Sequence, residues 1–282
     1  MVALRQLAAV LIVFLLAPFV NRAKAGGPAS DSLFSQSTLE ALNRDFPSAD
    51  TSFLLLDART GHVLAARWEH AEIPIPMGSL DKPFAALAYA RYHGDRFPSH
   101  TCRGTATGCW RPRGHGALDL PSAVAYSCNS YFRALAANLN ANEVSATAAH
   151  FGLESPAPGT SGAALAGLGG DWRTSPQHMA SAYLELFRHR DEPAGAQLLN
   201  GMAMSARVGT AAAVDRALRF NAAIAKTGTA PCTHKHRAPG DGFTVAMFPA
   251  DFPRVLLLVR VHGVPGAVAA KTAGQMLYRI EN

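Results

Sequence analysis

The sequence predicts an α+β fold in which both ends of the chain build one antiparallel sheet that helices flank. Short apolar runs separated by turn residues lie near the amino end, at 53–56 and 63–66. Similar runs return in the carboxyl-terminal third, and apolar residues at helical spacing fill the segment between. Strands at both ends with helices in the middle favour a single shared sheet with a helical subdomain beside it.

The amino-terminal residues have the pattern of an export signal. Arg5 precedes an apolar run over 7–20, which is shorter than the roughly 20 residues of a spanning helix, and Ala-Lys-Ala at 23–25 is a small-x-small cleavage site. We expect an exported, periplasmic or otherwise extracytoplasmic protein that is cleaved after Ala25. Amino-terminal sequencing of the native protein tests this expectation. Recovery of intact Met1 in a membrane fraction would favour the alternative, an uncleaved amino-terminal membrane anchor.

Composition bounds the remaining chain. Residues 1–25 hold three basic residues and no acidic one, so their removal lowers the formal net charge from +6 to +3. We therefore expect no nucleic-acid partner. With 49% hydrophobic and 16% charged residues the chain can bury a large core. We divide it into the signal at 1–25, a lead-in with a short helix at 26–50, and one large domain at 51–282.

The first half of the chain alternates strands and helices. Residues 26–36 are rich in Gly and Ser and predict a flexible lead-in, and 37–40 form a capping box for a helix through Arg44. The runs at 53–56 and 63–66 are separated by a turn and predict a β-hairpin. A further helix is expected from near Ser79 to Gly94, because Pro83 fits only in a first turn.

The second half returns to strands. Residues 97–118 are expected to form a loop, and apolar spacing predicts a helix after Asn129. Ser175 and Pro176 are typical of a helix start. The expected carboxyl-terminal elements are three strands and a last helix, at 222–229, 243–248, 255–261 and 267–280.

Three motifs, each present once, carry the chemistry. They are Ser79-Leu80-Asp81-Lys82, Ser127-Cys128-Asn129 and Lys226-Thr227-Gly228. Serine is a poor nucleophile until a neighbouring base takes its proton. Lys82 follows Ser79 at position i+3, which places both side chains on one face of a helix start. Lysine serves as that base when burial or another cation, such as Lys226, lowers its pKa.

The other two motifs supply partners for this serine. In the functional interpretation Ser127 relays a proton and Asn129 binds a substrate amide, whereas the structural alternative is helix capping. Lys226 and Thr227 are placed to hold a carboxylate. Two neighbouring residues complete the expected site. Gly228 would let substrate approach the backbone closely, and the Thr229 N–H would act as an oxyanion donor together with N–H groups at the helix start.

The sequence resembles the penicillin-recognising serine acyltransferases, and in particular the transpeptidase domains of penicillin-binding proteins. The resemblance includes the contexts GSLDKPF, AYSCNSYF and AKTGTA. It extends to GLGGDWRTSPQHMASAY and DGFTVAMFPADFPRVLLLV. It implies a nucleophile at Ser79, a base at Lys82 and catalysis by Ser127, with substrate contacts in the third motif. It also implies a peptidoglycan stem peptide ending in D-Ala-D-Ala as substrate, trapping by β-lactams, and no cofactor.

The sequence is also compatible with two other functions. A β-lactamase of the carboxylated-lysine class is one, although that class usually has an apolar residue at the position of Asn129. A β-lactam or peptidoglycan-binding module that acylates without turnover is the other. Between the second and third motifs the sequence contains no E-x-x-L-N segment, the setting of the deacylating glutamate in the first class of β-lactamases.

The four cysteines permit disulfides in an exported chain. Cys102 and Cys109 lie seven residues apart in a Gly- and Thr-rich loop, so one expectation is a disulfide that closes it. The alternative is small buried thiols. Cys232 lies close to His234 and His236, but no second ligand pair follows at zinc spacing. We therefore expect no metal site.

Overall fold

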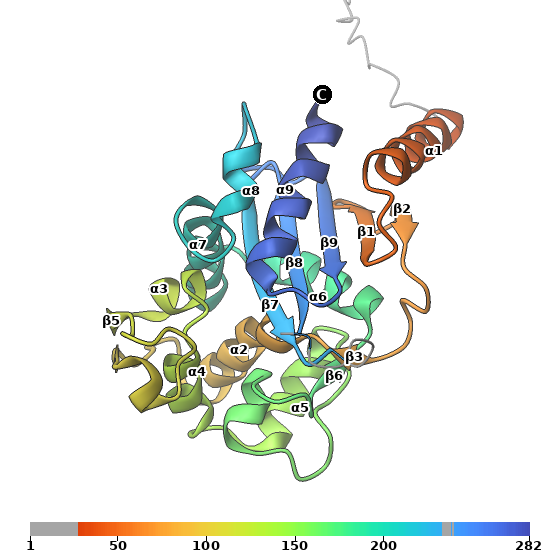
Figure 1. The fold of residues 1–282 in the computed structure, drawn as a ribbon. Helices are drawn as coiled ribbons and strands as arrows, with labels where there is room; N and C mark the ends of the chain where they lie inside the picture. The colour runs from red at the N-terminus through yellow and green to blue at the C-terminus, as the bar shows by residue number, and fades with distance from the viewer. Residues whose placement is uncertain (1–27, 233–237, 239) are drawn as a thin grey trace, which may run out of the picture.

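One sheet organises the part of the chain that the computed structural model describes, which is residues 28–232, 238 and 240–282. The sheet has the strand order β2-β1-β9-β8-β7, and every neighbouring pair is antiparallel. These strands are β1 (Thr51–Asp57), β2 (Val63–Arg67), β7 (Ile224–Ala230), β8 (Asp241–Phe248) and β9 (Val255–Val261). Pairing of β1 with β9 confirms that the two ends of the chain complete one sheet (Figure 1).

Both faces of the sheet are buried, which explains why its central strands are apolar almost throughout. Successive side chains of a strand point to opposite faces. Phe53 and Leu55 of β1 pack in one hydrophobic cluster with Leu277 of α9 (Gly266–Glu281). Leu54 and Leu56 belong to the other cluster, which includes Phe84. The sheet therefore lies between two helical layers.

The helices form a subdomain on the side of the sheet away from α9. They are α2 (Lys82–His93), α3 (Leu120–Ala125), α4 (Asn129–Ala136), α5 (Ala141–His150), α6 (Pro176–Arg188) and α7 (Pro193–Arg207). Helix α8 (Ala212–Ala217) instead packs on α9, on the other side of the sheet. Two small strand pairs join them: β3 (Ile75–Pro76) with β6 (Arg173–Thr174), and β4 (His100–Cys102) with β5 (Gly116–Leu118). Three 3-10 turns complete the described elements, η1 (Gly78–Leu80), η2 (Gly104–Thr107) and η3 (Gly162–Ala166).

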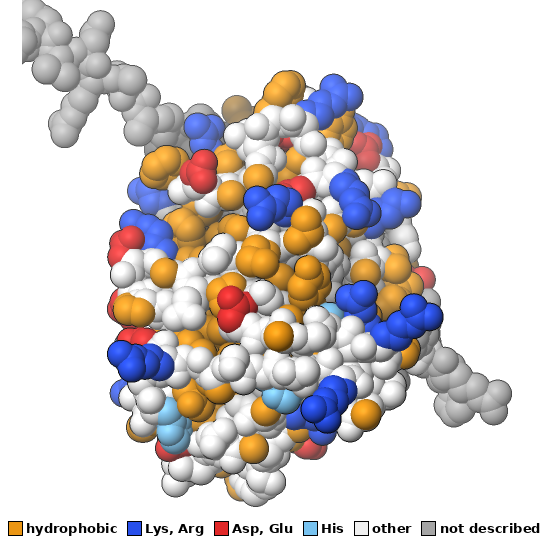
Figure 2. Space-filling view, turned by 90° about the vertical axis from the view of Figure 1, so that its left-hand side faces the viewer, with side chains coloured by type: hydrophobic (Ala, Val, Ile, Leu, Met, Phe, Trp, Pro, Cys, Tyr) orange, Lys and Arg blue, Asp and Glu red, His pale blue; other side chains and the backbone are white. Residues whose placement is uncertain are grey.

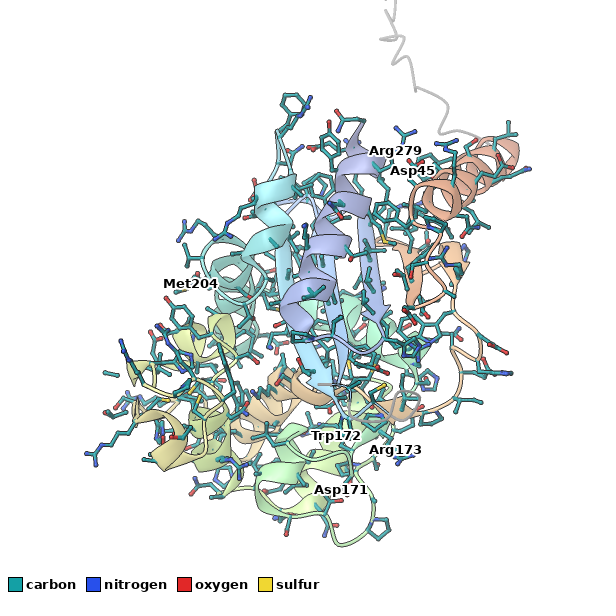
Figure 3. The ribbon with its side chains drawn as sticks, viewed as in Figure 1. Asp45, Asp171, Trp172, Arg173, Met204 and Arg279 are labelled. Atoms are coloured by element: carbon teal, nitrogen blue, oxygen red, sulfur yellow. The ribbon has the colours of Figure 1, made fainter. Side chains whose placement is uncertain are left out.

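The amino-terminal helix begins earlier than the sequence predicts. Helix α1 spans Pro28–Asp45, so the expected lead-in ends before Pro28 and the capping box lies inside the helix. Proline suits the first turn of a helix, and no Gly or Pro follows until after Asp45. Arg279 of α9 donates to Asp45 over 2.7 Å, and Figure 3 shows the two side chains meeting between the helices. The export signal at 1–25 lies outside the described residues.

Two further expectations are corrected. Helix α2 begins at Lys82, and Ser79 lies in the 3-10 turn η1 immediately before it. The segment 97–118, expected as a loop, contains β4, η2 and β5. Among the helices in the described ranges, none has both the length and the apolar content to cross a membrane.

The face shown in Figure 2 has hydrophobic side chains in its middle, with Lys and Arg side chains scattered around them. A nucleic-acid partner is expected to need positive charges gathered in a patch or stripe. The positive charges on this face do not form one stripe, so it offers no argument for such a partner.

Candidate active site

The three motifs meet around one pocket at the edge of the sheet. Its cavity volume is about 580 Å³. Ser79, Ser127, Asn129 and 227–229 all line it, so each motif contributes to one surface. These segments come from the turn before α2, the junction of α3 and α4, and strand β7.

Ser127 occupies a sharp turn between α3 and α4. Its φ is +50°, in the left-handed region that non-glycine residues seldom adopt. The turn is held from both sides, because the Ser127 N–H donates to Val124 and the indole N–H of Trp110 donates to the Ser127 carbonyl over 3.2 Å. Asn129 then opens α4. This geometry places the Ser127 hydroxyl in the pocket wall.

Lys82 is the centre of a buried polar network. Its side chain is 0% exposed. The Nζ donates to the Ser127 carbonyl over 2.9 Å and lies 3.3 Å from Ser127 Oγ and 2.7 Å from Asn129 Oδ1. It also lies 5.3 Å from the centre of the Phe132 ring. The first and second motifs are thus joined by direct hydrogen bonds.

Lys226 joins the third motif to the same network. Its Nζ donates to Ser127 Oγ over 3.0 Å and to the Thr227 carbonyl over 2.7 Å, and its side chain is 0% exposed. Ser127 Oγ therefore lies within hydrogen-bond distance of two lysines. The hydroxyl of Thr227 is 2.6 Å from that of Thr210.

Both lysines favour the neutral state more than an exposed lysine does. Burial lowers the pKa of Lys82 to about 7, and Arg133 acts in the same direction. Burial, followed by the charge on Lys82, holds the pKa of Lys226 well below its ordinary value. Removing an ammonium from water is costly, and two ammonium groups sharing Ser127 would repel each other. Lys82 is therefore able to accept a proton near neutral pH.

Close backbone contacts fix the first motif against the third. A Cβ added to Gly78 would collide with the carbonyl oxygen of Thr229, and one added to Gly228 would collide with that of Met77. We expected Gly228 to admit substrate close to the backbone. Gly228 also lines the pocket, so close approach of substrate stays a prediction, and the structure adds a second reason for glycine, the contact with Met77.

We expect Gly78→Ala to disrupt both stability and the position of Ser79. Gly78 has a φ of +58°, and an added Cβ meets Thr229. Gly152→Ala is the matched control, since its φ is +70° but nothing lies within 4 Å of the added Cβ. The free energy of unfolding of the control should fall only by the cost of a non-glycine residue in the left-handed region, about 1–2 kcal/mol. Denaturant unfolding and the penicillin acylation rate measure both effects. Equal losses in the two variants would contradict the steric argument.

Thr229 contributes its backbone more than its side chain. The Thr229 hydroxyl accepts from the Gly266 N–H over 2.9 Å, which ties β7 to the first turn of α9. Thr229 is also one of the residues that line the pocket. The role of the Thr229 N–H as an oxyanion donor stays a prediction.

Sequence reasoning missed three residues that support the site. Thr210 orients Thr227, and Trp110 holds the Ser127 turn. Asp81 is the third: it is buried, its carboxyl oxygens have no hydrogen-bond partner among the described residues, and burial raises its pKa well above the ordinary value. Thr210 and Trp110 act through contacts distant in sequence. The one local signal was an aspartate inside the first motif.

The expected Cys102–Cys109 disulfide is not formed in the structure. Both thiols are free and buried, and the Nδ1 of His115 lies 3.6 Å from each sulfur. The imidazole thus occupies the space between them. The metal alternative considered for Cys232 involves His234 and His236, which lie outside the described residues.

A mixed α/β domain with a buried lysine–serine–lysine arrangement beside a pocket has the make-up of an acyl-transfer enzyme. The sequence profile of the penicillin binding protein transpeptidase domain matches residues 51–280. The chain belongs to this family. No curated protein matches the chain.

Solved structures agree with this assignment at the level of the fold. The chain is similar to Pseudomonas aeruginosa PBP2 with a TM-score of 0.72 at 19% identity, over 86% of this chain and 73% of that one. The transpeptidase domain of Burkholderia pseudomallei penicillin-binding protein 3 gives 0.64 at 15%, over 88% and 92%. Helicobacter pylori PBP2, solved in complex with MreC, gives 0.74 at 14%, over 87% and 62%.

Proposed function

We propose that this protein is a penicillin-binding D,D-transpeptidase or D,D-carboxypeptidase that forms an acyl-enzyme on Ser79. Its substrates are peptidoglycan stem peptides ending in D-Ala-D-Ala. The observation that carries the proposal is the position of Ser127 Oγ, 3.3 Å from Lys82 Nζ and 3.0 Å from Lys226 Nζ, in the wall of a pocket that Ser79 also lines.

We propose the following acylation step. Ser79 Oγ attacks the carbonyl of the penultimate D-alanine, and neutral Lys82 accepts the hydroxyl proton. The N–H groups of Ser79 and Thr229 stabilise the oxyanion. Ser127 then passes a proton from Lys82 to the nitrogen of the departing D-alanine. The C–N bond breaks, and an ester to Ser79 remains.

The remaining groups orient the peptide. Lys226 and Thr227 hold the terminal carboxylate, which would also stabilise the charged form of Lys226. Asn129 accepts from Lys82 through its oxygen, so its NH₂ group is available to donate to a backbone carbonyl of the stem. An amine acceptor resolves the ester in a transpeptidase, and water resolves it in a carboxypeptidase.

Product analysis with a stem pentapeptide tests the proposal. Release of D-alanine in water alone identifies a carboxypeptidase, and a cross-linked product that requires an added amine identifies a transpeptidase. The Ser79→Ala variant should give neither product. If the wild-type protein binds the peptide but releases no D-alanine under either condition, the non-turnover alternative replaces this proposal.

The proposed location of the protein in the cell rests on the export signal. Cleavage after Ala25 would place the domain in the periplasm, where stem peptides are found, and an uncleaved signal would anchor it to the membrane. Both outcomes bring the pocket to an extracytoplasmic substrate.

A further inference from the structure

Three thiols and an imidazole meet beside the second motif. Cys102 ends β4, Cys109 follows η2, His115 precedes β5, and Cys128 lies between α3 and α4. One ligand atom of each lies within 4.8 Å of all the others. All three cysteines are buried. The proposed acyl transfer uses none of these four side chains.

The distances match those between the ligands of a tetrahedral metal centre. His115 Nδ1 lies 3.6 Å from the sulfurs of Cys102 and Cys109, and the sulfurs of Cys109 and Cys128 are 3.9 Å apart. Tetrahedral zinc has Zn–S bonds of about 2.3 Å and Zn–N bonds of about 2.0–2.1 Å, which separate two sulfurs by about 3.8 Å and a sulfur from a nitrogen by about 3.6 Å. A disulfide would need sulfurs about 2.05 Å apart.

The surrounding loop is folded tightly around the cluster. Gly104 and Gly114 have φ values of +71° and +73°. A Cβ at Gly114 would collide with the carbonyl oxygen of Cys102, and one at Gly104 with that of Pro112. Only glycine therefore permits the crossing that brings these ligands together.

The imidazole is held by stacking. Its ring lies 5.4 Å from that of Tyr126 at an interplanar angle of 15°, and 5.5 Å from that of Trp110. Its buried Nε2 has no partner within the described part of the chain. Ring packing therefore presents Nδ1 to the three sulfurs.

We propose that Cys102, Cys109, His115 and Cys128 bind one zinc ion in a closed structural site. Thiolates with one imidazole are a ligand set that zinc prefers, and four protein ligands leave no open position for substrate or water. Binding replaces thiol protons with metal–sulfur bonds and involves no redox change. Because Cys128 lies between Ser127 and Asn129, the ion fixes the second motif of the active site.

Metal analysis of the full-length protein tests this site independently of any enzymatic activity. Elemental mass spectrometry should find about one zinc ion per chain. A mercurial reagent that reacts with thiols should release this zinc. Cys102→Ser should lose most of it, and the matched control Cys232→Ser should keep it. Cobalt added after zinc removal should give the thiolate charge-transfer and tetrahedral ligand-field absorption. If the variants fail to fold, the stoichiometry and cobalt spectrum of the wild-type protein decide.

Two results would overturn the site. The first is a wild-type protein without zinc whose peptide map contains a Cys102–Cys109 disulfide. The second is zinc that Cys102→Ser retains and Cys232→Ser loses. For the link to the active site, zinc removal should slow acylation by benzylpenicillin about tenfold or more, with recovery on adding zinc but not magnesium. An unchanged rate in zinc-free protein would contradict that link.

Discussion

Benzylpenicillin is expected to leave a covalent adduct on Ser79 that persists for minutes to hours, and Ser79→Ala should abolish it. Attack of Ser79 on the β-lactam carbonyl opens the ring, but the leaving nitrogen stays tethered to the acyl group. It therefore continues to block the side from which water would approach. Fast hydrolysis would require a base directed at a water on another side.

The described lining of the pocket offers no carboxylate base for this task. No residue that lines it in the described ranges is acidic. Asp81, the carboxyl group of the first motif, is buried and does not line the pocket. The expected absence of a deacylating glutamate in the sequence is consistent with this lining. The acyl-enzyme should therefore accumulate.

Intact-mass measurements over several hours test this expectation. The wild-type protein should gain the mass of one benzylpenicillin, and peptide mapping should locate it on Ser79. The matched control is Ser155→Ala, which removes an exposed serine and should acylate as the wild type does. Rapid, repeated turnover of penicillin would refute the prediction and support the β-lactamase alternative.

The sheet could be predicted because each of its strands is a local apolar run in the sequence. Several helices could not be predicted in this way. The runs at 53–56 and 255–261 are buried on both faces, and their register follows from one antiparallel sheet. Helix α7 is absent from the elements expected from sequence, and it contains Gly195 and Gly201, a residue type unfavourable inside helices. In the structure a Cβ at Gly201 would lie 2.7 Å from the Pro121 carbonyl oxygen, so glycine there permits close packing with α3.

The meeting of the three motifs at one pocket could be predicted from the sequence, whereas the residues that support them could not. Ser127, Lys82 and Lys226 meet as their motifs suggest. Thr210 and Trp110 contribute through contacts that no local pattern reveals. The four proposed zinc ligands were missed for a related reason, because their spacing of 7, 6 and 13 residues contains no closely spaced ligand pair.

Lys82→Ala is expected to slow acylation by at least about a hundredfold, the lower range for loss of a general base. Lys82 Nζ contacts Ser127 Oγ and Asn129 Oδ1, so the variant loses both the base and the group that joins the first two motifs. Lys271→Ala is the matched control, because it removes an exposed lysine on α9.

The pH profile separates these two contributions. Burial lowers the pKa of Lys82 to about 7, so the neutral, proton-accepting fraction grows as pH rises through that value. Acylation by benzylpenicillin should therefore rise through about pH 7 and level off about one pH unit higher in the wild type and in Lys271→Ala. Lys82→Ala should be slow at every pH and lack this rise. A wild-type rate that climbs only near pH 10, the range of an ordinary lysine, would show that Lys82 is not the base.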